Sequence, residues 1–263
     1  MHKPRNRTTA HVNDHVSGFV PVSNFENGPV KNAAQAARNR AYIDAHGTLA
    51  INLMSSPGSG KTTLLEETIE ALRNTFKIAV IEGDLNTEND AERIRAKGAP
   101  AIQIKTSTSG YLDAHMVDQA LNQLILDGVD ILFIENVGNL VCPTQCDVGQ
   151  HRNVVLLSVT EGDDKPVKYP NMFRTADVVL LTKTDLLQVV DDFDAARVGQ
   201  YLLQLGSDAP LMPLSAKRHS AMRGWFNWLH LERDAQRTRV AAGKTTQPLP
   251  KVNGAPVSSG IAA

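Results

Sequence analysis

The sequence has few cysteines, an almost balanced charge and no long apolar run, and each shortage excludes a class of protein. Two cysteines in 263 residues cannot form the disulfide framework of a small secreted fold. Lys and Arg total 27 against 28 Asp and Glu, so the formal net charge of −1 favours neither nucleic acid nor an acidic membrane surface. Apolar runs fall short of the roughly 20 residues that span a bilayer. Because the sequence also opens without an apolar targeting segment, we expect a cytoplasmic protein.

The 42% hydrophobic content is enough for one substantial core, and the composition changes at both ends. Residues 1–30 show no periodicity and predict a disordered tail. Residues 31–47 are rich in helix formers and finish in a glycine, which predicts a helix packed ahead of the main domain. Residues 235–263 turn to Thr, Gly, Gln, Pro and Ser and predict a second disordered tail. The main domain is therefore expected over residues 48–234.

Short apolar strands alternate with amphipathic helices through this domain, without an internal repeat, which is typical of a parallel α/β sheet. The expected strands cover residues 49–54, 78–82, 101–104, 131–135, 154–159, 178–182 and 211–214. The expected helices cover residues 61–74, 90–97, 111–126, 194–205 and 221–232. Polar residues gather where the strands end, and ligands of such sheets bind at the carboxyl ends of strands.

A glycine-rich stretch at residues 55–63 (SSPGSGKTT) lies between the first strand and the first helix, the setting of a phosphate-binding loop, or P-loop. Its glycines let successive backbone N–H groups point at a triphosphate, and the helix N-terminus adds its positive dipole end. Lys61 can reach the β- and γ-phosphates, and the Thr62 hydroxyl can bind Mg²⁺. Ser55 departs from the GxxxxGKS/T pattern, and a glycine-rich turn without a ligand is the alternative. The expected contacts are Gly58, Ser59, Gly60, Lys61, Thr62 and Thr63.

Two acidic residues end strands behind this loop. Asp84 closes the second strand (IEGD), where a carboxylate can hold Mg²⁺ directly or through water, or orient the attacking water. Glu135 closes another strand (ENVG), where an acid followed by Gly138 can sense a γ-phosphate. Acids at strand ends also cap helices, which is the alternative for each. Their occurrence together behind a P-loop favours a catalytic set of Lys61, Thr62, Asp84 and Glu135.

Two later segments predict guanine recognition. Thr182-Lys183-Thr184-Asp185 resembles the NKxD element of GTPases, with Thr in place of Asn, and a carboxylate at Asp185 can accept from the ring N–H and the exocyclic amine of guanine. Ser215-Ala216-Lys217 resembles the SAK element that lines the base with backbone amides. These residues favour GTP over ATP, although an Asp that caps a helix is the alternative for Asp185.

From about Asn39 to Leu229 the chain resembles the hydrogenase-maturation nickel-insertion GTPase family, HypB, which is related to the urease-accessory GTPase UreG. The resemblance is carried by NRAYIDAHG, NLMSSPGSGKTTLL, IEGDLNTENDAERI, LDAHMV, FIENVGNLVCP, SVTEGDDKPVKYPNMF, TKTDLL and SAK. It implies an α/β P-loop NTPase of the dimerising GTPase class, with a mostly parallel sheet flanked by helices. It also implies a nucleotide-dependent homodimer that, with partner maturation proteins, delivers Ni²⁺ to the large subunit of a [NiFe] hydrogenase. Because no water-orienting Gln or arginine in cis is evident, we expect slow Mg²⁺-dependent hydrolysis.

The resemblance breaks at the transition-metal site. Members of the family usually place a Cys-His pair where this chain has Gly110-Tyr111, and only Cys142 remains of their Ni²⁺ or Zn²⁺ ligands. Cys146 follows at a spacing that lets two thiolates bind one metal, and His115 is expected one helical turn after Tyr111. A relocated site of Cys142, Cys146 and His115 is one interpretation. An ordinary loop cysteine and a solvated histidine are the other.

Two further functions stay open from the sequence. A GTP-switched scaffold for maturation partners, with little metal carriage of its own, fits the missing Cys-His pair. A P-loop ATPase or small-molecule kinase is the third interpretation, against which Asp185 argues. The acidic segment 160–166 (TEGDDKP) is either a nucleotide-sensing loop or a solvated connection.

Overall fold

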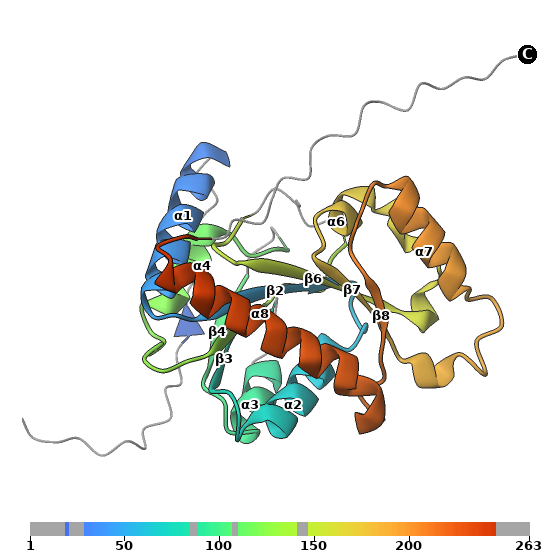
Figure 1. Cartoon of the computed structure of the whole chain (residues 1–263), viewed down its shortest axis with the longest axis horizontal. Coiled ribbons are helices and arrows are strands. Elements are labelled where there is room, and N and C mark those ends of the chain that lie inside the picture. Colours follow the sequence, from blue (N-terminus) through green and yellow to red (C-terminus); the bar gives the residue numbers. More distant parts are fainter. Residues whose placement is uncertain (1–18, 21–28, 85–88, 107–109, 141–146, 246–263) are drawn as a thin grey trace, which may run out of the picture.

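The computed structural model describes residues 19–20, 29–84, 89–106, 110–140 and 147–245. Within them, eight strands form one sheet in the order β1-β4-β3-β5-β2-β6-β7-β8, and all neighbouring strands run parallel (Figure 1). The strands are β1 (Phe19–Val20), β2 (Leu49–Ser55), β3 (Ile78–Asp84), β4 (Ala101–Lys105), β5 (Ile131–Glu135), β6 (Arg152–Ser158), β7 (Val178–Thr182) and β8 (Leu211–Pro213). The predicted mostly parallel α/β sheet is confirmed.

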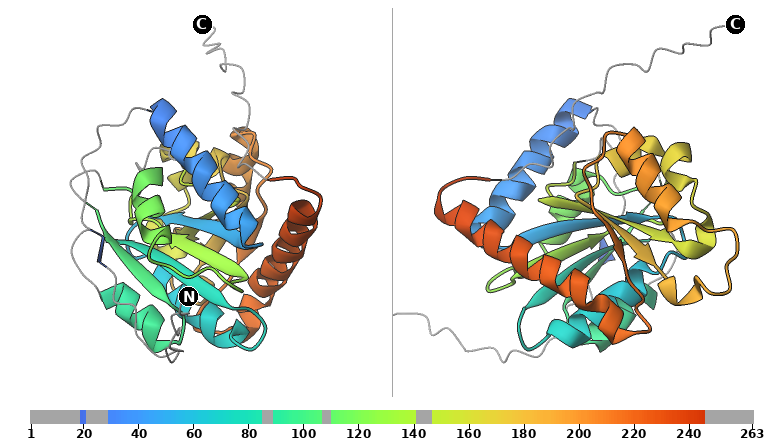
Figure 2. Two further views of the ribbon diagram at one scale, coloured as in Figure 1. Left: turned by 90° about the vertical axis from the view of Figure 1, so that its left-hand side faces the viewer. Right: turned by 45° about the vertical axis from the view of Figure 1, so that its right-hand side comes forward.

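Helices connect the strands and cover both faces of the sheet (Figure 2). They are α1 (Pro29–Ala45), α2 (Lys61–Leu72), α3 (Asn89–Ala96), α4 (Ala114–Leu121), α5 (Lys165–Lys168), α6 (Pro170–Arg174), α7 (Ala195–Gln204) and α8 (Arg223–Ala241). Three short 3₁₀ turns join them in the described ranges: η1 (Val159–Glu161), η2 (Thr184–Leu186) and η3 (His219–Met222). None of the described helices has the apolar length that a bilayer crossing requires.

Alternating strand residues point to opposite faces, and this divides the core into two layers. On one face, α2, α3 and α8 pack on Ile51, Leu53 and Phe133. On the other face, α1 and α4 pack on Ala50 and Ile81. On that same face α6 and α7 cover β6 and β7. With both faces covered, the strands of the sheet centre are buried along their whole length, as expected for parallel sheets.

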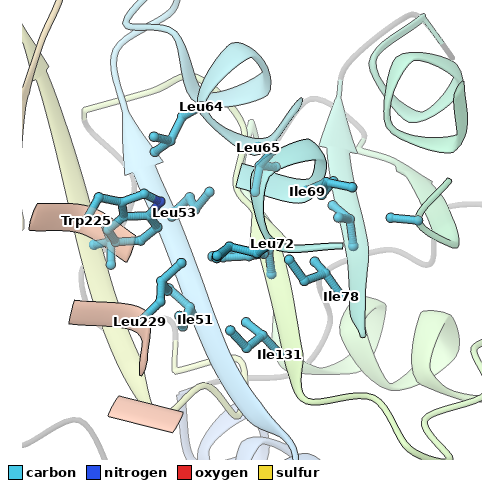
Figure 3. Packing of buried hydrophobic residues seen from close by; sticks show 14 of the residues in the cluster. Ile51, Leu53, Leu64, Leu65, Ile69, Leu72, Ile78, Ile131, Trp225 and Leu229 are labelled. Carbon is cyan, nitrogen blue, oxygen red and sulfur yellow. The ribbon is translucent and has the colours of Figure 1, made fainter. Parts of the chain in front are cut away.

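Helix α8 lies against the helix that follows the P-loop. Trp225 is fully buried, and its indole N–H donates to Thr68 Oγ1 of α2 at 2.9 Å. Figure 3 shows Trp225 and Leu229 next to Leu53 and Ile51 of β2. An aromatic side chain of this size fills the angle between α2 and the central strand, and it fixes the position of α2 relative to the sheet.

All seven predicted strands are present, with ends within two residues of the prediction. One predicted helix starts too early, because Asp113 caps α4: its side chain accepts from the Met116 N–H at 2.8 Å. The helix therefore begins at Ala114 and not at residue 111. Tyr111 lies outside the helix, so the predicted one-turn relation between Tyr111 and His115 is wrong.

The C-terminal boundary was also placed too early. Residues 235–241 were predicted to belong to a disordered tail, but α8 continues through Ala241. Gln236 is fully buried, and its Nε2 donates to Asp44 Oδ1 at 2.7 Å. Asp44 also accepts from Nε2 of the buried His151 at 3.0 Å. This network joins α8 to the end of α1 and the start of β6, which composition alone could not indicate.

The predicted N-terminal boundary needs a smaller correction. Helix α1 begins at Pro29, a residue suited to the first turn because its missing N–H has no intrahelical partner there. Within the predicted 1–30 tail, Phe19–Val20 pair in parallel with Gln103 and Ile104 of β4 and extend the sheet by one short strand. The remaining residues of both predicted tails lie outside the described ranges, except 242–245.

Candidate nucleotide site

The P-loop joins the central strand β2 to α2. Gly58 and Gly60 have φ angles of 75° and 97°, in the left-handed region that residues with a side chain rarely adopt. The Lys61 ammonium donates to Ser55 Oγ at 2.9 Å, and both side chains are buried. Ser55, the departure from the consensus, therefore supplies a hydroxyl that holds Lys61 against the loop.

The outer side of the P-loop is held by residues from the ends of β6 and β7. Ser59 Oγ lies 2.5 Å from Oε1 of Glu161. The Thr182 hydroxyl donates to the Ser59 carbonyl at 2.8 Å, and Lys183 Nζ donates to the Gly58 carbonyl at 2.7 Å. The start of the predicted base-recognition element thus contacts the loop directly.

Two buried carboxyl groups, Glu82 of β3 and Glu135 of β5, face each other beside the P-loop. They are neighbours in the register of the two strands, and each is at most 3% exposed. The Thr62 hydroxyl donates to Glu135 Oε1 at 3.1 Å. The Oε2 atoms of both glutamates are buried without a hydrogen-bond partner in the described structure.

Burial dominates the ionisation of this pair. It raises the pKa of Glu82 well above its usual range, and the adjacent Glu135 carboxylate raises that pKa further. Burial also raises the pKa of Glu135, although the Lys61 ammonium opposes this. Burial and the proximity of the two carboxyl groups therefore disfavour ionisation of both at once. Glu82 was not predicted from the sequence, which indicated Asp84 at the end of the same strand. The available signal was an acidic residue within an apolar strand.

A cavity of about 580 Å³, the phosphate cavity, opens beside the loop. Gly138 of the ENVG segment lies so close that an added Cβ would be 2.9 Å from Pro57 Cα, which explains the glycine. Asp90 and Arg93 of α3 also line this cavity and were not predicted from sequence. The other lining residues include Gly58, Gly60, Lys61, Thr62, Thr63, Glu82, Glu135 and Lys183.

A second cavity of about 290 Å³, the base pocket, adjoins the first and shares Gly60, Thr63 and Lys183 with it. Its lining brings together the two segments predicted to recognise guanine, namely Thr182, Lys183, Asp185, Ser215, Ala216 and Lys217. Lys183 has a φ of 58°, the one positive value among the described residues other than glycine. Such a backbone conformation is costly and is found mainly where function requires it.

Ser215 holds the carboxylate of Asp185 in place. Its hydroxyl donates to Asp185 Oδ1 at 2.6 Å, and this hydrogen bond lowers the pKa of Asp185. The carboxylate is therefore ionised at neutral pH, with Oδ2 and the remaining lone pairs free to accept from a ligand. An ionised acceptor at the end of β7, next to a phosphate-type cavity, suits a base that presents two adjacent N–H donors.

Comparison with known proteins decides the family. The sequence pattern of the "CobW/HypB/UreG, nucleotide-binding domain" family matches residues 49–213, from the first residue of β2 to the last of β8. The hydrogenase maturation factor HypB of Azotobacter chroococcum is 50% identical over 215 residues, which cover 81% of this chain and 70% of that protein. The chain belongs to the HypB family of hydrogenase maturation factors.

Other HypB proteins agree. HypB of Escherichia coli is 49% identical over 205 residues, covering 78% of this chain and 70% of that protein. The crystal structure of HypB from Helicobacter pylori in complex with nickel matches with a TM-score of 0.75 and 41% identity, over 79% of this chain and 97% of that one. These similarities confirm the predicted family and its P-loop GTPase fold.

The predicted transition-metal residues are only partly described. His115 of α4 is half-buried, and its Nε2 lies 3.2 Å from Nε2 of Gln119. Cys142 and Cys146 lie outside the described residues. Within the described ranges, no three His, Cys, Asp or Glu side chains converge as a metal site. The relocated HypB metal site therefore stays a prediction.

Asp84 and the acidic segment 160–166 remain from the sequence predictions. Asp84 is the last residue of β3, in register with Lys105 of β4, and its side chain lies outside the described structure. In the acidic segment, Glu161 touches Ser59 of the P-loop, and the buried Asp163 pairs with Arg197 at 3.1 Å. This HypB segment is therefore not merely a solvated connection.

Proposed function

We propose that this HypB family member is a cytoplasmic GTPase that binds GTP with Mg²⁺ as a homodimer, hydrolyses it slowly and assists nickel insertion into a [NiFe] hydrogenase. The observation that carries the nucleotide part is the junction of the two cavities. A pocket with an oriented carboxylate, Asp185, meets a phosphate-type cavity at Gly60, Thr63 and Lys183. One guanine nucleotide would occupy both cavities.

The protein's own groups account for triphosphate binding. The backbone N–H groups at the start of α2 and the positive end of that helix favour the phosphates. Lys61, whose ammonium donates to Ser55 Oγ, would reach the β- and γ-phosphates of a bound nucleotide. Asp185 would accept from the guanine edge, and Ala216 and Lys217, which belong to the lining of the base pocket, would contact the base through their backbone.

The donors present fit Mg²⁺, a hard cation that prefers oxygen ligands. Buried carboxyl oxygens of Glu82 and Glu135 lack partners in the described structure, and the Thr62 hydroxyl lies 3.1 Å from Glu135 Oε1. We assign Thr62 and Asp84 to the ion, with Glu135 next to it. When bound, Mg²⁺ would neutralise charge on the β- and γ-phosphates.

Glu135 and Gly138 connect hydrolysis to a change of shape. Glu135 is hydrogen-bonded to Thr62, and Gly138 packs against Pro57 of the P-loop. A γ-phosphate that engages this segment would be released from it on hydrolysis, as in other nucleotide switches. In the sequence this segment is followed by Cys142 and Cys146, two of the three proposed metal ligands, so a change in the segment would reach them along the chain.

Nickel is the cargo in this proposal. The support is the family membership and the nickel complex of the Helicobacter pylori HypB. Cys142, Cys146 and His115 are the ligands we assign, for Ni²⁺ or for Zn²⁺, with the hydrogenase large subunit and other maturation proteins as partners. A second function, a GTP-switched scaffold without metal carriage, is favoured by Gly110-Tyr111 at the family's Cys-His position.

Two experiments test these parts separately. Calorimetric titration with GTP, GDP and ATP should show tight binding of both guanine nucleotides and weak binding of ATP, and equal affinity for GTP and ATP would contradict the base assignment. Titration of the GTP-loaded protein with Ni²⁺ and Zn²⁺ is then repeated for Cys142→Ala and Cys146→Ala. A loss of metal affinity in both variants supports nickel carriage by these cysteines. If the unmodified protein binds neither metal, the scaffold function is favoured.

A further inference from the structure

Arg93 places a guanidinium at the phosphate cavity. It belongs to α3, three residues after Asp90, and both residues line the cavity together with residues of the P-loop. Lys61 and Lys183 are the other cationic side chains in the described lining. Sequence reasoning identified no arginine that could act on the nucleotide of its own chain, because Arg93 lies in the segment IEGDLNTENDAERI but is not one of the residues predicted there to bind nucleotide or Mg²⁺.

The guanidinium is held at the rim by two carboxylates. Arg93 donates from Nε and Nη2 to Glu66 of α2 at 3.0 and 2.6 Å, and from Nη1 to Asp90 at 2.9 Å. Its side chain is 44% exposed, so the guanidinium remains accessible to solvent while the two carboxylates hold it. The two carboxylates therefore orient the Arg93 side chain, and its exposure leaves room for the guanidinium to change partners.

Hydrolysis creates the charge that such a group stabilises. A water oxygen bonds to the γ-phosphorus, the bond from that phosphorus to the bridging oxygen breaks, and the bridging oxygen keeps the electron pair as part of GDP. The water proton passes to solvent, and inorganic phosphate leaves. Negative charge therefore grows between the β- and γ-phosphates, where the planar donors of an arginine are well matched.

We propose that Arg93 is a catalytic residue for GTP hydrolysis, which exchanges Glu66 and Asp90 for the phosphate oxygens of GTP bound to the same chain. This inference rests on the proposed GTPase function and extends it. Arg93 lines the cavity of its own P-loop, so the action is in cis. The carboxylates would hold the guanidinium near the site until the triphosphate arrives.

A structural role of Arg93 has to be separated from the proposed catalytic role, because the Arg93–Glu66 ion pair also connects α3 to α2. The chain offers a matched control four residues further along, where Lys97, the residue after α3, pairs with Glu70 of α2. Lys97→Ala removes an equivalent link between the helices, and Lys97 is not among the residues of the phosphate cavity. Glu66→Gln breaks the Arg93 ion pair itself but keeps the guanidinium.

The test measures GTP turnover at saturating GTP and Mg²⁺, GDP affinity and thermal unfolding for the unmodified chain and these variants. Arg93→Ala should lower kcat by at least about tenfold, since an arginine at the transferring phosphate contributes much more than this in related reactions. GDP affinity should stay within about threefold, because the group acts where charge develops. Glu66→Gln and Lys97→Ala should keep kcat within about twofold of the unmodified chain.

The inference is overturned if Arg93→Ala turns over GTP like the unmodified chain, or if Glu66→Gln loses as much activity as Arg93→Ala. The second result would assign the effect to the link between α2 and α3. Absence of GTP turnover in the unmodified chain would be a different failure, that of the proposed function.

Discussion

The hydroxyl of Ser215 donates a 2.6 Å hydrogen bond to Oδ1 of Asp185, joining the segment after β8 to the end of β7. Through this contact the two segments that sequence analysis assigned to guanine recognition form one wall of the base pocket. Under the proposed function, the specificity of the site for its base depends on this one oriented carboxylate.

Asp185→Asn replaces an acceptor with a group that also donates. We expect GTP affinity to fall about ten- to a hundredfold, because one N–H of guanine then faces an N–H of the amide. Xanthosine triphosphate, which carries a carbonyl at that position, should gain affinity. Competition binding measures both. Asp191→Asn, an exposed residue outside the described pocket lining, makes the same charge change and should bind GTP normally.

Thr62→Ala should weaken the response to Mg²⁺. Without the hydroxyl, the cation loses a ligand, so the Mg²⁺ concentration for half-maximal turnover is expected to rise by about tenfold or more. Thr62→Ser keeps the hydroxyl and should restore the response. Turnover measured across a Mg²⁺ series, with chelator as the zero point, gives the result. Equal Mg²⁺ dependence in Thr62→Ala would remove Thr62 from the metal site.

Glu82 makes the stability of the nucleotide-free protein depend on pH. Its folded pKa lies above its ordinary value of 4.5, so the folded state binds more protons than the unfolded state once the pH exceeds that value. Stability is fully present below that pH and is lost as the pH rises through the folded pKa. Glu82→Gln should remove this loss and raise the melting temperature most at alkaline pH, by a few degrees for each ~1 kcal/mol regained.

The control for this prediction is Glu92→Gln, an exposed acid on α3. It should leave the slope of melting temperature against pH unchanged. If Glu82→Gln also leaves that slope unchanged, the buried carboxyl pair is not the source of the pH dependence.

Gln236 anchors the last turns of α8. Gln236→Ala removes a buried donor to Asp44 Oδ1 and should lower the free energy of unfolding by about 1–3 kcal/mol. Arg237→Ala, at the exposed neighbouring position, should change it by less than about 0.5 kcal/mol. Denaturant unfolding of both variants measures the difference. Equal stability would mean that the end of α8 contributes nothing to the fold.

The strands and the nucleotide segments could be predicted because their signals are local. Apolar runs, glycines and adjacent polar residues determine β2, the P-loop and the position of Asp185 without knowledge of distant contacts. The α4 start was misplaced because a pattern of apolar residues extends across Asp113, and the side-chain cap, not the pattern, decides where the helix begins.

The missed residues depend on contacts between distant parts of the chain. Glu82 is buried in the sheet, and it meets Glu135, 53 positions away along the sequence by their residue numbers, when β3 pairs with β5. Arg93 enters the site because α3 packs beside α2. The end of α8 looks like a polar tail until Gln236 meets Asp44 and His151. Neither composition nor periodicity contains information about such contacts between residues that are distant in the sequence.

Helix α8 is attached near each end to a different part of the molecule. Trp225 bonds Thr68 on the helix that follows the P-loop, and Gln236 bonds Asp44 at the end of α1. One continuous helix, with a rise of about 1.5 Å per residue, connects these two contacts, so α8 behaves as a rigid element between them. If α2 tilts when a ligand fills the P-loop, α8 would transmit that movement to the end of α1. A chain truncated before Gln236 would lose this coupling, because the bond to Asp44 would be missing.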